Sequence, residues 1–356
     1  MKRNNATRSW ALAALLLAPG ISVVAADDPA RRVTLEDPIP VDKNRVGLSY
    51  RAAFNITARF KNVGNVGGGG RGPGPATGGD IDRFYDDGYN RVDISGNKDG
   101  LTWFWGYQNA SQVPGNDTLV MHSSSPTAVN TKPIDDDPQN GFELTYSREL
   151  GRSEKKDWRW GVEAGAGWSD INIRDDRPLA SGVRTIADAY NLGGVVPPPG
   201  HSGTFEGPGP LIEDRPNRTI TTSPSGSVIL GARQFDADLF TLRFGPYLEI
   251  PIDDRFTFSL SVGPAVGFIN GEFKFNQQVS TGGTSKRQTG SGSESDVLWG
   301  GFAAATIRYA INDRWSAFVG GQYLGLTDYH AKAGGQEIEL TLGRTALFTL
   351  GVGYTF

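Results

Sequence analysis

The sequence predicts an all-β fold: an up-and-down antiparallel β-barrel that crosses a membrane with about ten strands, or with eight or twelve as alternatives. Apolar residues recur at every second position over runs of strand length, whereas an amphipathic helix would place them three and four residues apart. Short connections alternate with long ones along the chain. Only alternate residues of a barrel meet lipid, which agrees with the modest hydrophobic fraction of 38%.

The clearest expected strand covers residues 45–61, where Val46, Leu48 and Tyr50 begin a continuous apolar face. Nine further segments show the same alternation: 89–95, 101–107, 142–150, 158–168, 240–250, 256–268, 297–309, 315–323 and 338–356. Several are longer than the about 9–11 residues that cross a membrane. We therefore expect these strands to project beyond the bilayer.

The connections between these strands fall into two classes of length. Four are short: 96–100, 151–157, 252–255 and 312–314. Five are long: 62–88, 110–140, 174–233, 277–295 and 325–336. Bacterial outer-membrane barrels have short periplasmic turns and long outer loops, whereas a soluble β-sandwich has no reason to sort its loops in this way. Two questions stay open: whether 219–230 adds a strand pair above the membrane, and whether 174–233 plugs the barrel.

The N-terminus has the pattern of a secretory signal peptide, with basic residues before the apolar run 10–17 and small residues at 24–26. That run is too short for a transmembrane helix, which needs about 20 residues. The expected organisation is a signal peptide at 1–26, a periplasmic N-terminal segment at 27–44 and the barrel over 45–356.

Composition excludes several classes of function. Cysteine is absent, so disulfides and thiol chemistry are excluded, and the net charge of −4 gives no nucleic-acid footprint. The acidic clusters at 86–87, 135–137 and 175–176 lack the ligand spacing of a known calcium loop, so we expect solvated turns rather than metal sites. No cofactor is expected.

The last strand carries the most specific motif of the chain. Thr349, Gly351, Tyr354 and Phe356 follow the order polar, x, Gly, x, x, aromatic, x, aromatic. This order resembles the C-terminal signal that outer-membrane barrels present to their assembly machinery. The resemblance implies a location in the bacterial outer membrane, with membrane lipid and the barrel-assembly machinery as partners. We expect a monomer that does not bind nucleic acid.

Aromatic residues gather near the ends of the expected strands, as in the two girdles of a membrane barrel. Trp158, Tyr309 and Trp315 are expected at the periplasmic interface, and Trp168 and Trp299 nearer the outer one.

The opposite strand faces predict a lumen lined by charges of both signs. The expected lumen-facing residues are Arg51, Arg59, Glu143, Glu149, Arg159, Glu163, Arg243, Glu249 and Arg308. Burial of an unpaired charge is costly, so a packed interior of Arg–Glu pairs is favoured over a narrow water-filled pore. The first interpretation predicts a structural or surface-binding barrel, and the second predicts a small passive diffusion porin.

Two further patterns bear on function. Asp80 and Asp82, with Asp328 and His330, resemble the two pairs at the mouth of the ten-stranded omptin proteases, but only in these tripeptides. We therefore expect no enzyme activity and keep an omptin-like surface protease as the second alternative. The segments 85–89 and 103–107 combine Asp, Tyr and Trp, and they form either an outer binding patch or, as favoured here, a hairpin whose aromatic residues face lipid.

Overall fold

The structure is a computed structural model that describes residues 43–64, 72–115, 117–153 and 156–356. The expected signal peptide and nearly all of the expected periplasmic segment at 27–44 lie outside the described residues. Within them, helical structure is limited to two short turns, η1 (Lys98–Gly100) and η2 (Ala110–Gln112). In the part of the chain that the structure describes, no helix is long and apolar enough to cross a membrane.

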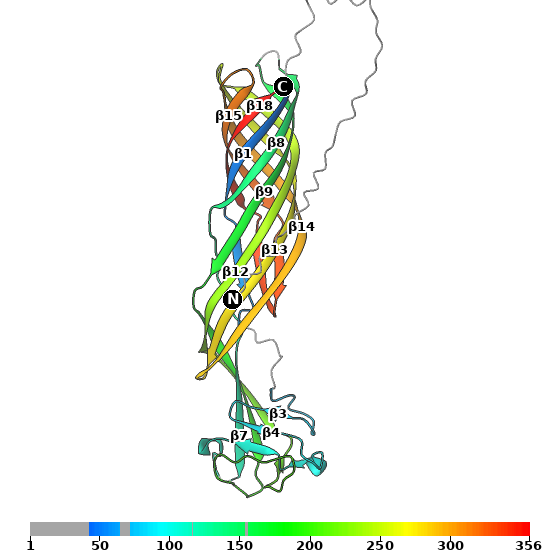
Figure 1. The fold of residues 1–356 in the computed structure, drawn as a ribbon, viewed down its shortest axis with the longest axis vertical. Helices are drawn as coiled ribbons and strands as arrows, with labels where there is room; N and C mark the ends of the chain where they lie inside the picture. Colours follow the sequence, from blue (N-terminus) through cyan, green and yellow to red (C-terminus); the bar gives the residue numbers. More distant parts are fainter. Residues whose placement is uncertain (1–42, 65–71, 116, 154–155) are drawn as a thin grey trace, which may run out of the picture. The chain divides into compact units, whose positions relative to one another are not determined.

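Eight antiparallel strands form a closed ring, which confirms the predicted β-barrel (Figure 1). In ring order they are β1 (Asn44–Phe54), β8 (Gln139–Arg152), β9 (Arg159–Asp175), β12 (Asn217–Pro251), β13 (Phe256–Thr281), β14 (Thr284–Ala310), β15 (Trp315–Leu326) and β18 (Thr345–Thr355). β1 closes the ring by pairing with β18, from Arg45 opposite Thr355 to Phe54 opposite Ala346. The barrel therefore has eight strands, one of the two alternatives to ten.

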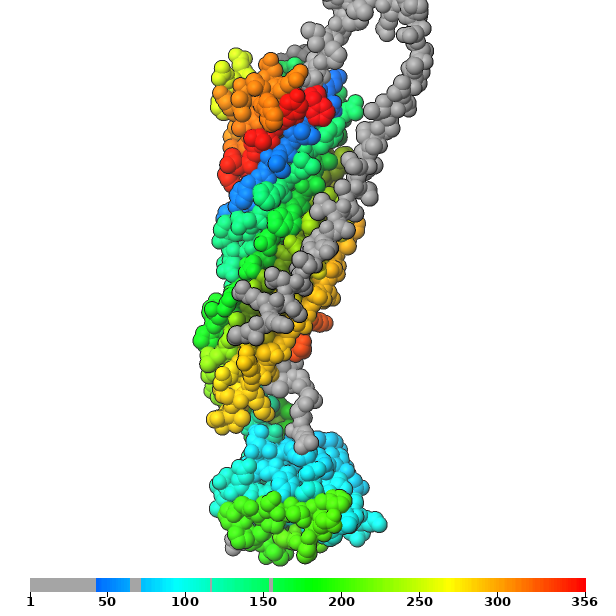
Figure 2. Space-filling model, viewed as in Figure 1, coloured from blue at the N-terminus to red at the C-terminus, as the bar shows by residue number. Residues whose placement is uncertain are grey.

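The two expected strands outside the ring, 89–95 and 101–107, belong to a separate part that we call the head, which consists of the described residues 72–115, 117 and 192–216. It contains the short strands β3 (Arg83–Phe84), β4 (Gly88–Asn90), β5 (Leu101–Thr102), β6 (Trp105–Tyr107) and β11 (Ile212–Glu213). Trp105 and Tyr107 are buried in its core, so these aromatic residues do not face lipid. Figure 2 shows the two segments of the head, in cyan and green, packed against each other.

One ring strand connects the barrel to the head. The first residues of β12 pair with β10 (Leu179–Asn191), which in turn pairs with β7 (Thr118–Pro126). The last residues of β12 pair with β9 and β13 inside the ring. The segment 174–233 thus supplies β10 and the head residues 192–216, and 219–230 does extend the sheet beyond the ring.

Part of the way along the barrel, the two faces of the ring strands change character. The inward face changes from polar to apolar, and the outward face changes from apolar to polar. On β12, odd residues from 233 to 249 face inward: Thr241, Arg243 and Glu249 are polar, whereas Phe235, Ala237 and Leu239 are apolar. The outward residues change in the opposite sense, from Phe240 and Leu242 to the polar side chains of 234, 236 and 238. We call the part with an apolar outer face the belt and the part beyond it the extension.

Neighbouring strands make this change at the same height. Phe240 pairs with Trp168 on β9 and with Phe268 on β13, and each of these is the last apolar outward residue of its strand before the extension. The belt of β12 covers residues 240–250, which matches the about 9–11 residues that cross a membrane. The strands β9, β12 and β13 continue beyond this belt.

The expected strand over 45–61 is broken in the structure. Asn55 has a left-handed backbone, with φ of 63°, and separates β1 from β2 (Thr57–Lys61). The break reverses the parity, so Phe60 becomes fully buried. Arg59 lies on the exposed face of β2, and its assignment to the lumen was wrong because no single alternation continues across Asn55.

In the extension, a second small sheet takes the place of the shorter ring strands. β2 pairs with β17 (Gln336–Thr341), and β17 pairs with β16 (Tyr329–Ala333). Phe60 packs on Phe273 with ring centroids 5.5 Å apart, and Tyr329 packs on Phe235 at 5.7 Å. The extension therefore encloses one apolar core made from ring strands and outer loops.

The end of the barrel opposite the head consists of tight connections. The chain turns between β12 and β13, and again between β14 and β15, within four residues each, and Asn44 exchanges backbone hydrogen bonds with Phe356 at 3.1 and 2.8 Å. The expected turn at 96–100 is an exception, since it lies in the head. Glycine is required where strands approach closely: a Cβ on Gly245 would lie 2.0 Å from the Val262 carbonyl oxygen.

Candidate functional site

The lumen of the belt holds a network of buried charges centred on Arg243. Its guanidinium donates to Glu143 Oε1 at 2.8 Å and to Glu163 Oε1 at 2.5 Å. Arg51 lies 3.8 Å from Glu143 and donates to the Thr241 hydroxyl at 3.1 Å. Two cations thus face two carboxylates, which offsets the cost of removing each charge from water.

A second layer lies nearer the short turns. Glu249 is 2% exposed and accepts a hydrogen bond from Arg45 Nη1 at 2.5 Å, with Arg308 Nε 4.0 Å away. Arg308 also lies over the Phe318 ring, 5.2 Å from its centroid. The guanidinium groups of this layer are therefore held by charge and by an aromatic face.

These side chains fill the lumen. The free volume among Glu143, Glu163, Arg243 and their neighbours is about 30 Å³, which is the share of one liquid water. Beyond it, Phe302, Leu298 and Leu239 begin the apolar core of the extension. Along the inside of the ring, the polar side chains of the two layers are thus followed by the apolar ones of the extension.

The structure places the nine predicted lumen charges in three groups. Seven face inward and join the two layers or lie beside them: Arg51, Glu143, Arg159, Glu163, Arg243, Glu249 and Arg308. Glu149 lies at the turn end of β8 and pairs with Arg152 at 3.9 Å, and Arg59 is outside the lumen. Arg45 was not among the predicted lumen residues, although Arg45 and Arg51 both have odd numbers on β1 and therefore lie on the same face.

The predicted girdle residues pack in pairs at the two ends of the belt. Trp315 and Tyr354 have centroids 5.1 Å apart, and Tyr309 lies 5.1 Å from Phe256 beside the short turns. At the outer end, Trp168 stacks on Phe142 and donates its indole N–H to Asp238 at 3.0 Å. Trp299 is 65% exposed near the outer end, and Lys156 lies over Trp158 near the turns. An indole that joins an apolar surface to a polar one is typical of a membrane interface.

The residues of the expected assembly signal lie on β18. Thr349 faces the lumen and Phe356 is exposed at the chain end, stacked 6.3 Å from Tyr354. Gly351 sits where a Cβ would lie 2.4 Å from the Leu48 carbonyl oxygen, so close strand pairing alone accounts for this glycine.

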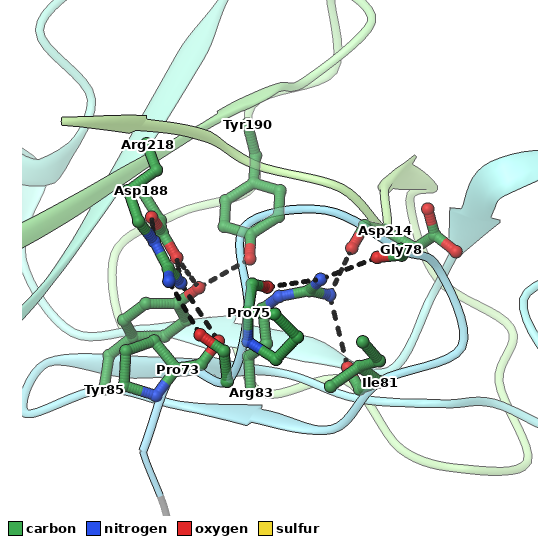
Figure 3. A network of polar contacts seen from close by, with 11 residues as sticks. Pro73, Pro75, Gly78, Ile81, Arg83, Tyr85, Asp188, Tyr190, Asp214 and Arg218 are labelled. Atoms are coloured by element: carbon green, nitrogen blue, oxygen red, sulfur yellow. Dashed lines mark hydrogen bonds and ion pairs between the residues drawn. The ribbon is translucent and has the colours of Figure 1, made fainter.

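A buried arginine, Arg83, joins the two segments of the head to each other (Figure 3). Its guanidinium donates to four backbone carbonyls: Asp214 at 2.6 Å, Gly78 at 2.8 Å, Pro75 at 3.2 Å and Ile81 at 3.3 Å. Arg83 thereby ties together two segments that are more than a hundred residues apart in sequence. No carboxylate pairs with Arg83 in these hydrogen bonds, so its role is to order backbone.

A second polar cluster lies beside Arg83 in Figure 3. Asp188 of β10 accepts two hydrogen bonds from Arg218 of β12 at 2.7 Å each and one from the Tyr85 hydroxyl at 2.6 Å. Burial raises the pKa of both Tyr85 and its neighbour Tyr190, whose hydroxyls lie 2.6 Å apart. Neutral phenols and an ion pair thus fix the head loop to the β10–β12 ladder.

The segments 85–89 and 103–107 lie in the head and do not form a lipid-facing hairpin. Arg91 is stacked over Phe104, 4.6 Å from its centroid, and Phe104 makes edge contacts with Tyr89 and Phe205. Phe205 is 47% exposed. Of the two interpretations of these segments, the structure therefore agrees with a surface patch outside the barrel.

The residues that resemble the omptin pairs have separate partners. Asp82 binds Arg91 Nε at 3.2 Å in the head, whereas His330 lies 3.1 Å from Glu337 within the β16–β17 hairpin. Asp80 donates its backbone N–H to Asp214 at 3.2 Å. No contact among the described residues joins the Asp80–Asp82 segment to Asp328 or His330.

The acidic clusters serve the local backbone. Asp86 and Asp87 accept hydrogen bonds from Ser124 and His122 at 2.6 and 2.7 Å. Asp175 binds Arg177 at 2.7 Å and the buried Arg233 at 3.1 Å. Within the described residues, no group of three or more His, Cys, Asp or Glu side chains could hold a metal ion.

Comparison with known proteins returns structural neighbours only. No protein-family model matches the sequence, and no curated protein is significantly similar to it. Three similar solved structures are Ail, the attachment invasion locus protein of Yersinia pestis, the outer membrane protease OmpT of Escherichia coli and the outer membrane protein OprG of Pseudomonas aeruginosa. Their identities to this chain are 11%, 12% and 11%, with TM-scores of 0.27, 0.34 and 0.24. The matches cover 88%, 89% and 89% of this chain and 99%, 98% and 99% of theirs.

Proposed function

We propose that this protein is an integral barrel of the bacterial outer membrane with a closed, charge-paired lumen, and that it displays its head at the cell surface to bind a ligand or another surface there. Outer-membrane lipid contacts the belt, and the barrel-assembly machinery inserts the chain as a monomer. The protein is not an enzyme and does not bind nucleic acid.

The exchange of face chemistry between belt and extension carries this proposal. A soluble barrel has no reason to expose Leu242, Phe244 and Val262 over one band while its interior there is charged. Lipid around the belt explains both facts, because the outer face then needs apolar groups and the lumen must satisfy its polar groups internally. Water around the extension explains the reversed arrangement there.

The filled lumen favours surface binding over the porin alternative. Arg243 occupies the axis of the belt with both carboxylate partners, and Phe302 lies against it, 4.8 Å from the guanidinium carbon to the ring centroid. A diffusion pore would need this layer to open and would leave Glu143 without its principal partner. The head, by contrast, is ordered by polar networks of its own.

The proposal is tested first by planar-bilayer conductance of the refolded chain. Heat-modifiable migration on a gel proves that the barrel is folded before each measurement. A folded barrel without channel steps is the expected result. Stable, voltage-independent steps would show an open lumen and would move the assignment to a diffusion pore.

Orientation is tested with a matched pair of protease sites in intact cells. One site is inserted at the Gly282–Gly283 tip of the β13–β14 hairpin, and the other in the turn between β12 and β13. We expect added protease to cut the first site in intact cells and the second only after the outer membrane is permeabilised. Cleavage in the reverse order would refute surface display of the head.

A further inference from the structure

A cavity of about 160 Å³ lies between the head and the barrel extension. Three segments line it: Asp86 of the head, the end of β7 and the tip of the β13–β14 hairpin. At about 30 Å³ for each water, it has room for about five. Such a space fits a small molecule about as large as one sugar ring.

The acidic wall of the cavity is held in place by the edge of β7. Asp86 Oδ2 accepts the Ser124 backbone N–H at 2.6 Å, and the Asp86 N–H donates to the His122 carbonyl at 2.8 Å. One bond holds the carboxyl group and the other holds the Asp86 backbone against β7. Oδ1 of Asp86 accepts no hydrogen bond from the described residues, so it is an acceptor that a ligand can use.

Hydrogen-bond donors line the same cavity as this acceptor. Ser123 and Thr284 place hydroxyl groups in the lining, and Lys286 adds an ammonium group. None of the three side chains has a hydrogen-bond partner among the described residues. Hydroxyls both donate and accept, so the lining offers each role several times over within one small space.

The remaining lining is apolar. Pro126 and the buried Val279 form part of the wall. The cavity therefore combines hydroxyl groups, one carboxylate and one ammonium group with an apolar patch. This combination matches a ring-shaped molecule that has polar groups around its edge and C–H groups on its face. Small-ligand sites commonly combine a few placed polar groups with apolar contact in this way.

We propose that this cavity binds one saccharide unit of a surface glycan. Ligand hydroxyls donate to Asp86 and accept from Ser123, Thr284 and Lys286, while the ring face packs on Pro126 and Val279. The inference rests on the proposed surface display, because only a cavity on the outer side of the membrane meets surface glycans. It adds to that function the class of ligand and the place where it binds.

Ligand-observed saturation-transfer NMR on the full refolded chain in deuterated detergent tests the site. The probes are D-glucose, D-galactose, D-mannose and N-acetyl-D-glucosamine at millimolar concentration. At least one is expected to receive saturation. Loss of one neutral hydrogen bond weakens binding by about fivefold, so Ser123→Ala and Thr284→Ala should each lower affinity by that factor and together by about 25-fold.

The matched control is Thr289→Ala on β14, an exposed hydroxyl that does not line the cavity, and it should bind like the unmodified chain. Asp86→Asn keeps an oxygen for Ser124 but removes the charge, and it should also weaken binding. The proposal is wrong if no sugar receives saturation, if the double variant binds normally, or if free glycine binds where sugars do not. A conducting barrel, in contrast, would refute the proposed function and leave sugar binding standing.

Discussion

Replacement of Arg243 by methionine should be the most damaging single change in the belt. The Arg243 side chain is 6% exposed and is the shared partner of Glu143 and Glu163. Its removal leaves Glu143, itself 4% exposed, with Arg51 at 3.8 Å as its nearest cation. Breaking a buried ion pair costs about 3–5 kcal/mol. Glu163 is 18% exposed and can recover part of its hydration, so we expect the lower half of that range.

The assay is urea-induced unfolding of the barrel refolded into lipid vesicles, followed by tryptophan fluorescence and by the gel shift. A loss of about 3–4 kcal/mol corresponds to about two to three decades in the folding equilibrium. Arg255→Met is the control, because Arg255 is exposed in the turn before β13 and its replacement should leave the stability nearly unchanged.

A compensating variant tests the charge argument itself. Arg243→Met together with Glu163→Gln removes one charge of each sign and leaves the Arg51–Glu143 pair intact. The double variant should recover at least half of the stability lost in the single one, because buried pairs replaced by neutral groups are often tolerated. If the single variant loses less than about 1 kcal/mol, or if the double variant is no better, the lumen is not held by charge pairing.

Three further predictions concern the belt, the strand break and the extension. Phe244→Arg, near the middle of the belt, should cost about 2–4 kcal/mol of unfolding free energy in vesicles, whereas Asp236→Arg, on the same face but in the extension, should cost little; equal losses would refute the membrane boundary. Asn55→Ala should destabilise by about 1 kcal/mol and Asn55→Gly by less, because alanine disfavours the left-handed backbone at φ 63°; the same urea titration measures both. Burial opposes ionisation of Asp175, yet hydrogen bonds from Arg177 and the charge of Arg233 lower its pKa below the usual value. Because the folded pKa is depressed, this stabilisation is present above the unfolded pKa of about 3.9 and is lost as the pH falls through the folded value. Native-state proteolysis of the extension between pH 6 and pH 3 should therefore show a smaller pH effect in Asp175→Asn than in the unmodified chain.

Period-two alternation was enough to predict the barrel, and its failures are local. The seven predicted charges that face the lumen all lie on ring strands, where inward and outward residues alternate. Arg59 was misplaced because one left-handed residue, Asn55, reverses the parity between β1 and β2. Asparagine is among the few residues that adopt this conformation readily, so the break had a possible signal, but asparagine is equally compatible with a continuous strand.

The strand count could not be settled by pattern alone. Residues 101–107 alternate like a membrane strand, yet Trp105 and Tyr107 face the core of the head. An aromatic residue at every second position fits a small soluble sheet as well as a lipid-facing strand, because both bury one face. Length was the better indicator: the expected strand had seven residues, fewer than the about 9–11 needed to cross a membrane.

The Arg83 and Asp188 clusters were beyond prediction for a different reason. The hydrogen bonds of the Arg83 guanidinium go to backbone carbonyl groups and not to a nearby acidic side chain. The positions of these carbonyl groups depend on how the loops fold. Asp188, Arg218 and Tyr85 meet only because β10 pairs with the first part of β12 and the head loop returns to that ladder. Such contacts between distant segments leave no trace in local periodicity.

The continuity of β12 links the lumen to the head mechanically. This strand of 35 residues carries three arginines: Arg218, which pairs with Asp188 of β10, Arg233 in the extension and Arg243 in the belt. Each arginine is held by an acid from another strand: Asp188, Asp175 and Glu143. A shear of β12 along its axis would have to break all three ion pairs at once, in addition to its ladder bonds with β9, β10 and β13. The head is therefore carried by a strand that is fixed at three levels, which suits a binding surface held at a set distance from the membrane and would not suit a gate that must move.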